Sequence, residues 1–139
     1  MSNKNKFNFK EKNCTVCNIK YSTRSEKSKF CSQNCDCLYR RQLTISKWKE
    51  GKVKGYKGKA MNVSSWLRRY LFEKYNSKCC KCGWCEINPT TNKIPLEVNH
   101  IDGNASNSIE ENLELVCPNC HSLTPNYRAL NKNSKRDRK

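Results

Sequence analysis

The chain has 139 residues, of which 35% are hydrophobic and 29% charged, and its formal net charge at pH 7 is +16. This composition argues against one large hydrophobic core, because small domains poor in apolar side chains need metals or disulfides to stabilise them. The excess of basic side chains favours a polyanionic partner such as nucleic acid. The sequence shows neither a signal peptide nor the roughly 20 consecutive apolar residues of a membrane span, so we expect a cytoplasmic protein with no membrane association.

The N-terminal half is predicted to consist of a polar tail, a finger and a basic linker. Residues 1–12 are rich in Lys and Asn, and we expect them to form a disordered basic tail. Residues 13–49 hold the first cysteines and a helix that begins after Ser32, a residue type suited to an N-cap, and runs towards Trp48. Residues 50–61 interleave Gly with Lys, which is typical of a flexible basic linker.

The C-terminal half is predicted to form a second domain over residues 62–130. Apolar side chains recur at helical spacing over 63–75, which predicts a helix. Two runs rich in β-formers, at 94–101 and 113–117, flank an Asp-Gly turn and predict a pair of strands. Residues 131–139 are polar and basic, and we expect them to form a second tail.

Eleven cysteines are available for metal binding. The cytosol keeps thiols reduced, and an odd number of cysteines cannot pair completely, so metal ligation is favoured over disulfides. Zinc takes four ligands tetrahedrally, and a Cys-x-x-Cys turn supplies two of them. We therefore predict two structural Zn²⁺ sites, each closed by four thiolates. The N-terminal cysteine set is Cys14, Cys17, Cys31 and Cys35, and the C-terminal cysteine set is Cys79, Cys82, Cys117 and Cys120.

Three further cysteines leave alternative ligands open. Cys37 competes for the fourth position of the N-terminal cysteine set. Cys80 and Cys85 lie beside the first pair of the C-terminal set, and Cys82 with Cys85 is also a Cys-x-x-Cys pair. We favour Cys79 with Cys82, because a glycine directly follows the second of them and helps the chain to turn.

The chain has only two histidines, and both lie near the C-terminal cysteine set. His121 directly follows the last predicted zinc ligand, His100 ends the first predicted strand, and Asn112 starts the second. Imidazole is the side chain best suited to proton transfer near neutral pH, and it is a common metal ligand. We interpret this grouping as a functional site on a basic carrier.

The ordered set of His100, Asn112 and His121, framed by two Cys-x-x-Cys pairs, resembles the HNH endonuclease family. The resemblance covers roughly residues 78–128, and the whole chain looks like the small phage HNH proteins that carry an N-terminal zinc finger. The motifs in register are Cys79-x-x-Cys82-Gly83, Glu97-Val-Asn-His100-Ile-Asp-Gly-Asn104, Glu111-Asn112-Leu113 and Cys117-Pro-Asn-Cys120-His121. The implied fold is small, zinc-stapled and α+β, with a treble-clef-like finger, a helical and basic linker, and a C-terminal ββα-metal domain.

The resemblance implies hydrolysis of a DNA phosphodiester with one divalent metal. His100 would be the general base, His121 a ligand of the catalytic metal, and Asn112 would orient the loop of His100. Asn99 falls where many relatives place an aspartate metal ligand. Because asparagine offers a carbonyl oxygen in place of a negative charge, we expect weaker metal affinity or a shifted metal preference. Mg²⁺ or Mn²⁺ is the expected ion, with Ni²⁺ and Zn²⁺ as further candidates.

Duplex DNA is the expected partner, bound by a monomer or weak homodimer. Lysine and arginine neutralise phosphates and release counterions. The candidate phosphate-binding residues are Arg40, Arg41, Lys52, Lys54, Lys57, Lys59, Arg68, Arg69 and Arg128.

A phage homing or mobile-element nuclease, acting in the cytoplasm of a bacterial host, is the favoured hypothesis. The alternatives are a catalytically silent zinc-finger DNA-binding protein or regulator, and a nuclease associated with phage DNA packaging.

Overall fold

The computed structural model describes residues 8–132, and it divides the chain between Ser46 and Lys47 into two compact units. Parts of both predicted tails, residues 1–7 and 133–139, lie outside the described residues. The predicted N-terminal tail also differs from the structure at its end. Strand β1, Lys10–Asn13, begins inside it, because these residues pair antiparallel with a second strand.

The first unit is a strand pair followed by the start of a long helix. Strand β2, Lys20–Thr23, pairs with β1 in a register that places Asn13 opposite Lys20. Helix α1, Gln33–Lys49, begins after Ser32, whose Oγ accepts a hydrogen bond from the backbone N–H of Cys35 at 3.3 Å. The N-cap expected from the sequence is therefore confirmed, and it fixes where the last N-terminal cysteine lies.

The structure places a short strand inside residues 50–61, the segment expected to form a flexible basic linker. Strand β3, Tyr56–Lys57, pairs antiparallel with β4, Asn62–Val63. Gly55 is buried, and a Cβ at this position would lie 2.4 Å from a side-chain carbon of Leu67. Packing therefore requires glycine at position 55, although the alternation of Gly and Lys in this segment is typical of a flexible linker.

Helix α2, Ser65–Lys74, buries Leu67 and Leu71, as its apolar spacing predicts. The last turn of α1 packs against it within the second unit. The ring of Trp48 lies edge-on to Tyr70 with 5.5 Å between centroids, and its Nε1 donates to the backbone oxygen of Ser108 at 2.6 Å. These contacts place the end of α1 within the second unit.

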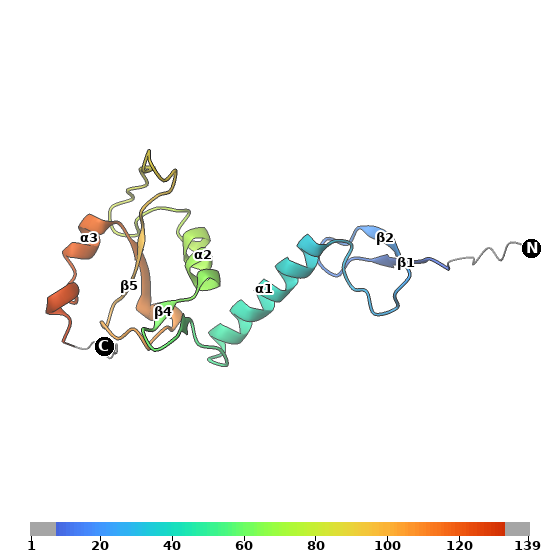
Figure 1. The fold of residues 1–139 in the computed structure, drawn as a ribbon, viewed down its shortest axis with the longest axis horizontal. Helices are drawn as coiled ribbons and strands as arrows, with labels where there is room; N and C mark the ends of the chain where they lie inside the picture. The colour runs from blue at the N-terminus through green and yellow to red at the C-terminus, as the bar shows by residue number, and fades with distance from the viewer. Residues whose placement is uncertain (1–7, 133–139) are drawn as a thin grey trace, which may run out of the picture. The chain divides into compact units, whose positions relative to one another are not determined.

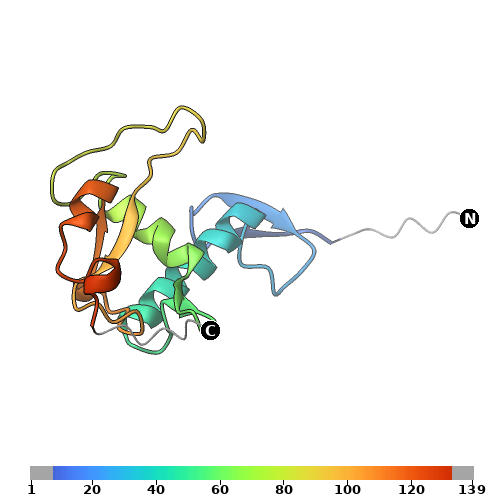
Figure 2. The same cartoon turned by 60° about the vertical axis from the view of Figure 1, so that its left-hand side comes forward.

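Strands β5, Glu97–His100, and β6, Leu113–Val116, form an antiparallel pair that is shorter than predicted. Helix α3, Pro118–Ser122, follows β6 directly, and α2 and α3 flank the strand pair (Figures 1 and 2). The core beside the strands contains Cys79, Leu96, Leu115, Val116 and Cys117. Short 3-10 turns, η1 over Glu110–Asn112 and η2 over Arg128–Leu130, complete the elements.

The small α+β class with two clusters of four cysteines is therefore confirmed. Asn112 is the last residue of η1 and not the first residue of β6, because its backbone N–H donates to the oxygen of Ile109 three residues earlier, at 3.2 Å. Within the described part of the chain, no helix combines the length and hydrophobicity that crossing a membrane would need.

Candidate functional site

Each predicted cysteine set is gathered in space, with its four sulfur atoms all within 4.8 Å of one another. Individual separations are 3.5 Å for Cys17–Cys31, 3.6 Å for Cys31–Cys35 and 3.8 Å for Cys82–Cys117. Four sulfurs bound tetrahedrally at a Zn–S distance of about 2.3 Å would stand about 3.8 Å apart. Both sets therefore fit a structural zinc ion.

The local backbone favours the thiolate of one cysteine in each set, while hydrogen bonds between the gathered thiols raise the pKa of Cys31 and of Cys120 to about 12. Burial raises the pKa of the Cys14 thiol, but hydrogen bonds from neighbouring backbone N–H groups bring it down to about 6. The pKa of Cys79 is brought to about 6 against burial in the same way. Because the thiolate is the metal-binding form, these turns are prepared for a cation.

Cys37, Cys80 and Cys85 are exposed and lie outside both sets. The sulfur of Cys80 lies 3.9 Å from a carboxylate oxygen of Glu114. The structure therefore gathers the predicted ligands and leaves these three alternatives outside both sets. Gly83 has a φ of +76°, and its N–H bonds the oxygen of Cys79 at 2.9 Å, so it makes the turn that the spacing indicated.

A cavity of about 330 Å³ lies beside β5 and α3. It brings together three of the predicted catalytic or metal-binding side chains and leaves Asn112 outside its lining. Its polar lining includes Glu97, Asn99, His100, His121, Asn126 and Arg128.

His121 reaches this cavity from the single turn of α3. The helix begins at Pro118 immediately after a zinc-ligand cysteine, so the zinc site determines where the imidazole lies. Its Nδ1 contacts the carboxylate of Glu97, and its ring packs edge-on against Tyr127 with 5.3 Å between centroids. With Nδ1 bonded to a carboxylate, Nε2 is the nitrogen available for a metal.

Glu97 is a site residue that the sequence analysis missed as a functional side chain. It stands two positions before Asn99 on β5, and alternate residues of a strand share a face. This alternation, applied to the strand that ends at His100, was the signal that could have found it.

The loop after His100 is held by the buried side chain of Asn112. The amide of Asn112 donates to Asp102 Oδ1 at 2.9 Å and to the oxygen of Asn107 at 2.7 Å, and its own oxygen accepts from the Asp102 N–H at 3.0 Å. Burial opposes ionisation of Asp102, but the bonds it accepts, two of them from Asn107 and Asn112, lower its pKa below the ordinary value. Asp102 is therefore a carboxylate that organises the turn.

The turn itself needs glycine at position 103. Gly103 has a φ of +74°, and a Cβ there would lie 2.7 Å from Asn131 Oδ1 and 2.8 Å from Asn126 Cγ. Both asparagines donate to backbone oxygens of the turn, at Gly103 and Ile101, each at 2.8 Å. The segment after α3 is thus bonded to the loop that follows His100.

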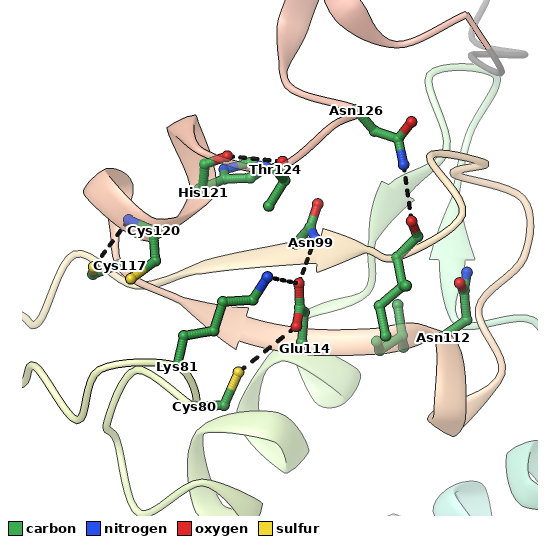
Figure 3. A network of polar contacts seen from close by, with 12 residues as sticks. Cys80, Lys81, Asn99, Asn112, Glu114, Cys117, Cys120, His121, Thr124 and Asn126 are labelled. Carbon is green, nitrogen blue, oxygen red and sulfur yellow. Dashed lines mark hydrogen bonds and ion pairs between the residues drawn. The ribbon is translucent and has the colours of Figure 1, made fainter.

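Asn99 is buried on β5, directly opposite Glu114 of β6. Its Nδ2 donates to Glu114 Oε1 at 2.7 Å, and Lys81 Nζ lies 3.1 Å from the same oxygen. Figure 3 shows the side-chain oxygen of Asn99 on the side away from Glu114. An oriented carbonyl oxygen therefore lines the cavity.

The donors in the cavity fit a hydrated divalent cation. Across residues 8–132, three or more His, Cys, Asp or Glu ligand atoms gather within 4.8 Å only in the two cysteine sets. The cavity adds a smaller set, the imidazole of His121 and the carbonyl of Asn99, beside the Glu97 carboxylate. Mg²⁺ and related ions keep several water ligands and need few from the protein.

Several predicted phosphate-binding residues already have partners inside the chain. Arg40 makes an ion pair with Asp36 at 2.6 Å, Arg69 with Glu73 at 3.2 Å, and Lys52 with Glu50 at 2.6 Å. Arg68 bonds the backbone oxygen of Leu96 at 3.3 Å, Lys54 lies over the ring of Tyr56, and Arg41 is partly buried. The side chains of Lys57 and Lys59 are exposed, and Arg128 lines the cavity with its guanidinium over Tyr127.

Over 70 residues, half of its length, the chain is 40% identical to the H-N-H endonuclease F-TflIV of Escherichia phage T5. The matched region covers 31% of that protein, so the chain spans about a third of the relative's length. No family model and no solved structure matches the chain. The resemblance to phage HNH endonucleases that the motifs indicated is confirmed by this relative.

Proposed function

We propose that this protein is an endonuclease that hydrolyses phosphodiester bonds of duplex DNA at the cavity between β5 and α3. The observation that supports it best is that the chain's only two histidines, His100 and His121, line the same cavity from different elements. A relative named as an H-N-H endonuclease, together with a net charge of +16, supports DNA as the substrate.

His100 is the general base of this proposal. An ordinary imidazole takes a proton from water near neutral pH. Its backbone oxygen accepts from Gly103 at 2.9 Å, and the N–H of the next residue donates to the backbone oxygen of Asn112, so the loop holds the backbone from which the ring projects. Asn112 is therefore a positioning residue that acts through Asp102 and the backbone.

A catalytic divalent metal would be held by His121 Nε2 and Asn99 Oδ1. When bound, it would stabilise negative charge on the scissile phosphate and the leaving oxygen. Glu97 would hold His121 in the tautomer that presents Nε2. The two zinc sites stay structural in this proposal, because four thiolates leave no position for a substrate.

Phosphate binding falls to the basic side chains outside residues 79–120, a segment with six acidic and two basic side chains. Lys57 and Lys59 beside the β3–β4 pair are exposed, and Arg128 lies at the cavity. A single module cuts one strand, so we expect nicking by a monomer, and double-strand cutting only through a weak homodimer or successive nicks.

The biological setting we propose is that of a phage-encoded homing or mobile-element nuclease acting in the cytoplasm of a bacterial host. A catalytically silent DNA-binding protein is the second candidate, and the neutral ligand at Asn99 is the observation that favours it. A nuclease associated with phage DNA packaging, the remaining alternative, would use the same site.

The test is relaxation of supercoiled plasmid by the zinc-loaded protein with Mg²⁺, Mn²⁺, Ni²⁺, Zn²⁺ or no added metal. We omit chelators from the reaction, because they would also strip the structural zinc. Nicked circles that require an added divalent ion are expected. Plasmid binding without nicking in every metal would contradict the nuclease and favour the silent DNA-binding protein.

A further inference from the structure

The amide of Asn99 is locked in one orientation by its neighbours. Glu114, directly opposite in the strand ladder, is a carboxylate and can only accept hydrogen bonds. The atom of Asn99 that lies 2.7 Å from Glu114 must therefore be the amide nitrogen, and the carbonyl oxygen must point the other way (Figure 3). The orientation follows from chemistry and does not depend on how the two atoms are assigned.

Lys81 holds Glu114 in place from the far side. Its Nζ lies 3.1 Å from the carboxylate oxygen that accepts from Asn99, and the Glu114 side chain is 15% exposed. Lys81 stands between Cys79 and Cys82, inside the first turn of the C-terminal zinc site. The zinc site is thereby connected to the cavity through Lys81, Glu114 and Asn99.

We propose that Glu114, held by Lys81, is a positioning residue that aims the Asn99 carbonyl oxygen into the cavity, and that this pairing makes the site require asparagine at position 99. The inference rests on the proposed function, because it gives that carbonyl its role as a metal ligand. It replaces the simpler expectation that asparagine here is only a weakened aspartate.

The pairing excludes aspartate for an electrostatic reason. Asn99→Asp would set two carboxylates at hydrogen-bond distance in a buried position, where neither can donate to the other. Like charges this close raise each other's energy unless one of them takes up a proton. The substituted side chain would either take up a proton, which restores a donor to Glu114 but removes the added charge, or turn away from Glu114, which removes the oriented oxygen. In neither case does a charged carboxylate in the orientation of the Asn99 amide reach the cavity.

The same pairing predicts that a second substitution, at Glu114, restores what Asn99→Asp removes. In the double variant Asn99→Asp/Glu114→Gln the hydrogen bond reverses, because glutamine donates to the new carboxylate. The total charge of the pair is unchanged. The atom that Lys81 now contacts becomes the glutamine nitrogen, so Lys81 must turn to the remaining glutamine oxygen. The carboxylate can then present its second oxygen to the cavity.

The first measurement is thermal unfolding of zinc-loaded protein with no catalytic metal added, which reports the pairing independently of any nuclease activity. Asn99→Asp is expected to lower Tm by about 5 °C or more, and the double variant to recover most of that loss. Glu114→Gln alone, which keeps the acceptor oxygen, is expected to change Tm little. Glu86→Gln is the matched control, because Glu86 is exposed and outside this network.

The second measurement is Mn²⁺ binding to the same four proteins, with zinc content verified in each. We expect Asn99→Asp to bind Mn²⁺ about 10-fold more weakly than the wild type, because changes to the groups that hold metal ligands in place typically weaken metal affinity by at least this much. The double variant is expected to bind at least as tightly as the wild type. If Asn99→Asp does not fold, recovery of folding by the double variant still tests the pairing.

An unchanged Tm in Asn99→Asp together with tighter Mn²⁺ binding would overturn this proposal, and so would a double variant that is no better than Asn99→Asp alone. A failure of the proposed function looks different. In that case the wild type would cut no plasmid in any metal, while the Tm loss and its rescue would still support the Asn99–Glu114 pairing.

Discussion

Glu97 and His121 meet across the cavity, the carboxylate of one contacting Nδ1 of the other, and the contact joins β5 to α3. β5 is otherwise joined to α3 through its pairing with β6, which α3 follows directly, and the C-terminal zinc site sets the start of α3. His121 is therefore held from two directions, by the backbone that follows a zinc ligand and by a carboxylate on the strand that ends at His100.

Glu97→Ala is expected to weaken binding of Mn²⁺ about 10- to 100-fold. Without the carboxylate, the imidazole of His121 is no longer held in one orientation or in the tautomer that presents Nε2. The measurement is a Mn²⁺ titration of zinc-loaded protein. Glu86→Ala serves as the control, since it removes an exposed carboxylate elsewhere. Equal Mn²⁺ affinity in Glu97→Ala and the wild type would show that Glu97 does not support the metal site.

Asn112→Ala is expected to lower the free energy of unfolding by about 2 kcal/mol, because it leaves partly buried partners in the Asp102 loop without their hydrogen bonds. Asn112→Asp should be at least as damaging, since it places a second carboxylate beside Asp102. Urea unfolding measures both. Asn119→Ala, at an exposed site on α3, should change stability little; a similar loss there would refute the assignment.

Cys117→Ser is expected to reduce bound zinc from two ions per chain to one and to unfold the second unit, because structural zinc contributes folding free energy directly. Metal analysis of the purified protein and near-UV circular dichroism would measure this. Cys85→Ser is the control, since that thiol lies outside both sets and should leave two zinc ions. If Cys85→Ser lost one zinc ion and Cys117→Ser kept both, then Cys85 and not Cys117 would be the zinc ligand.

Glu110 carries a pH-dependent share of the stability. Burial raises the pKa of its carboxyl, but hydrogen bonds from Lys74, Tyr70 and Lys49 outweigh this and lower it to about 2. The pKa of this carboxyl is 4.5 in the unfolded chain and lower in the folded protein. At pH values above 4.5 its ionised form therefore contributes its full stabilisation, and this contribution is lost as the pH falls from 4.5 towards 2.

Glu110→Gln is therefore expected to cost about 2 kcal/mol, equally at pH 8 and pH 5.5, because both lie above that window. Urea unfolding of zinc-loaded protein at the two pH values measures the difference. Glu111→Gln, an exposed neighbour, is the control and should be neutral. A loss that differs strongly between pH 8 and pH 5.5 would contradict the ionisation assigned to Glu110.

The sequence predicted which cysteines gather into two sets, because a Cys-x-x-Cys turn is a local structure whose spacing is visible along the chain. Ser32 could be identified as an N-cap for the same reason. The partners of Asn99 and His121 could not, since they depend on the register of β5 against β6 and on where α3 begins. Gly55 was misjudged because its close contact with Leu67 comes from a segment twelve residues away.

The register of β5 against β6 changes the interpretation of asparagine at position 99. From the sequence, asparagine in place of aspartate predicts weaker metal affinity or a shifted metal preference. Once Glu114 is known to lie opposite, the amide becomes the group that both satisfies the carboxylate and offers an oxygen to the cavity. Asp102, by contrast, was expected to serve the turn, and its hydrogen bonds to Asn107 and Asn112 fit that role.

The most direct test of the central proposal compares wild type and His100→Ala for DNA affinity and for plasmid nicking under single-turnover conditions in the most active metal. We expect His100→Ala to keep its two zinc ions and its DNA affinity while nicking falls at least about 100-fold, the contribution expected of a general base. Nicking by His100→Ala at the wild-type rate would contradict the assignment of His100 and of this cavity as the active site.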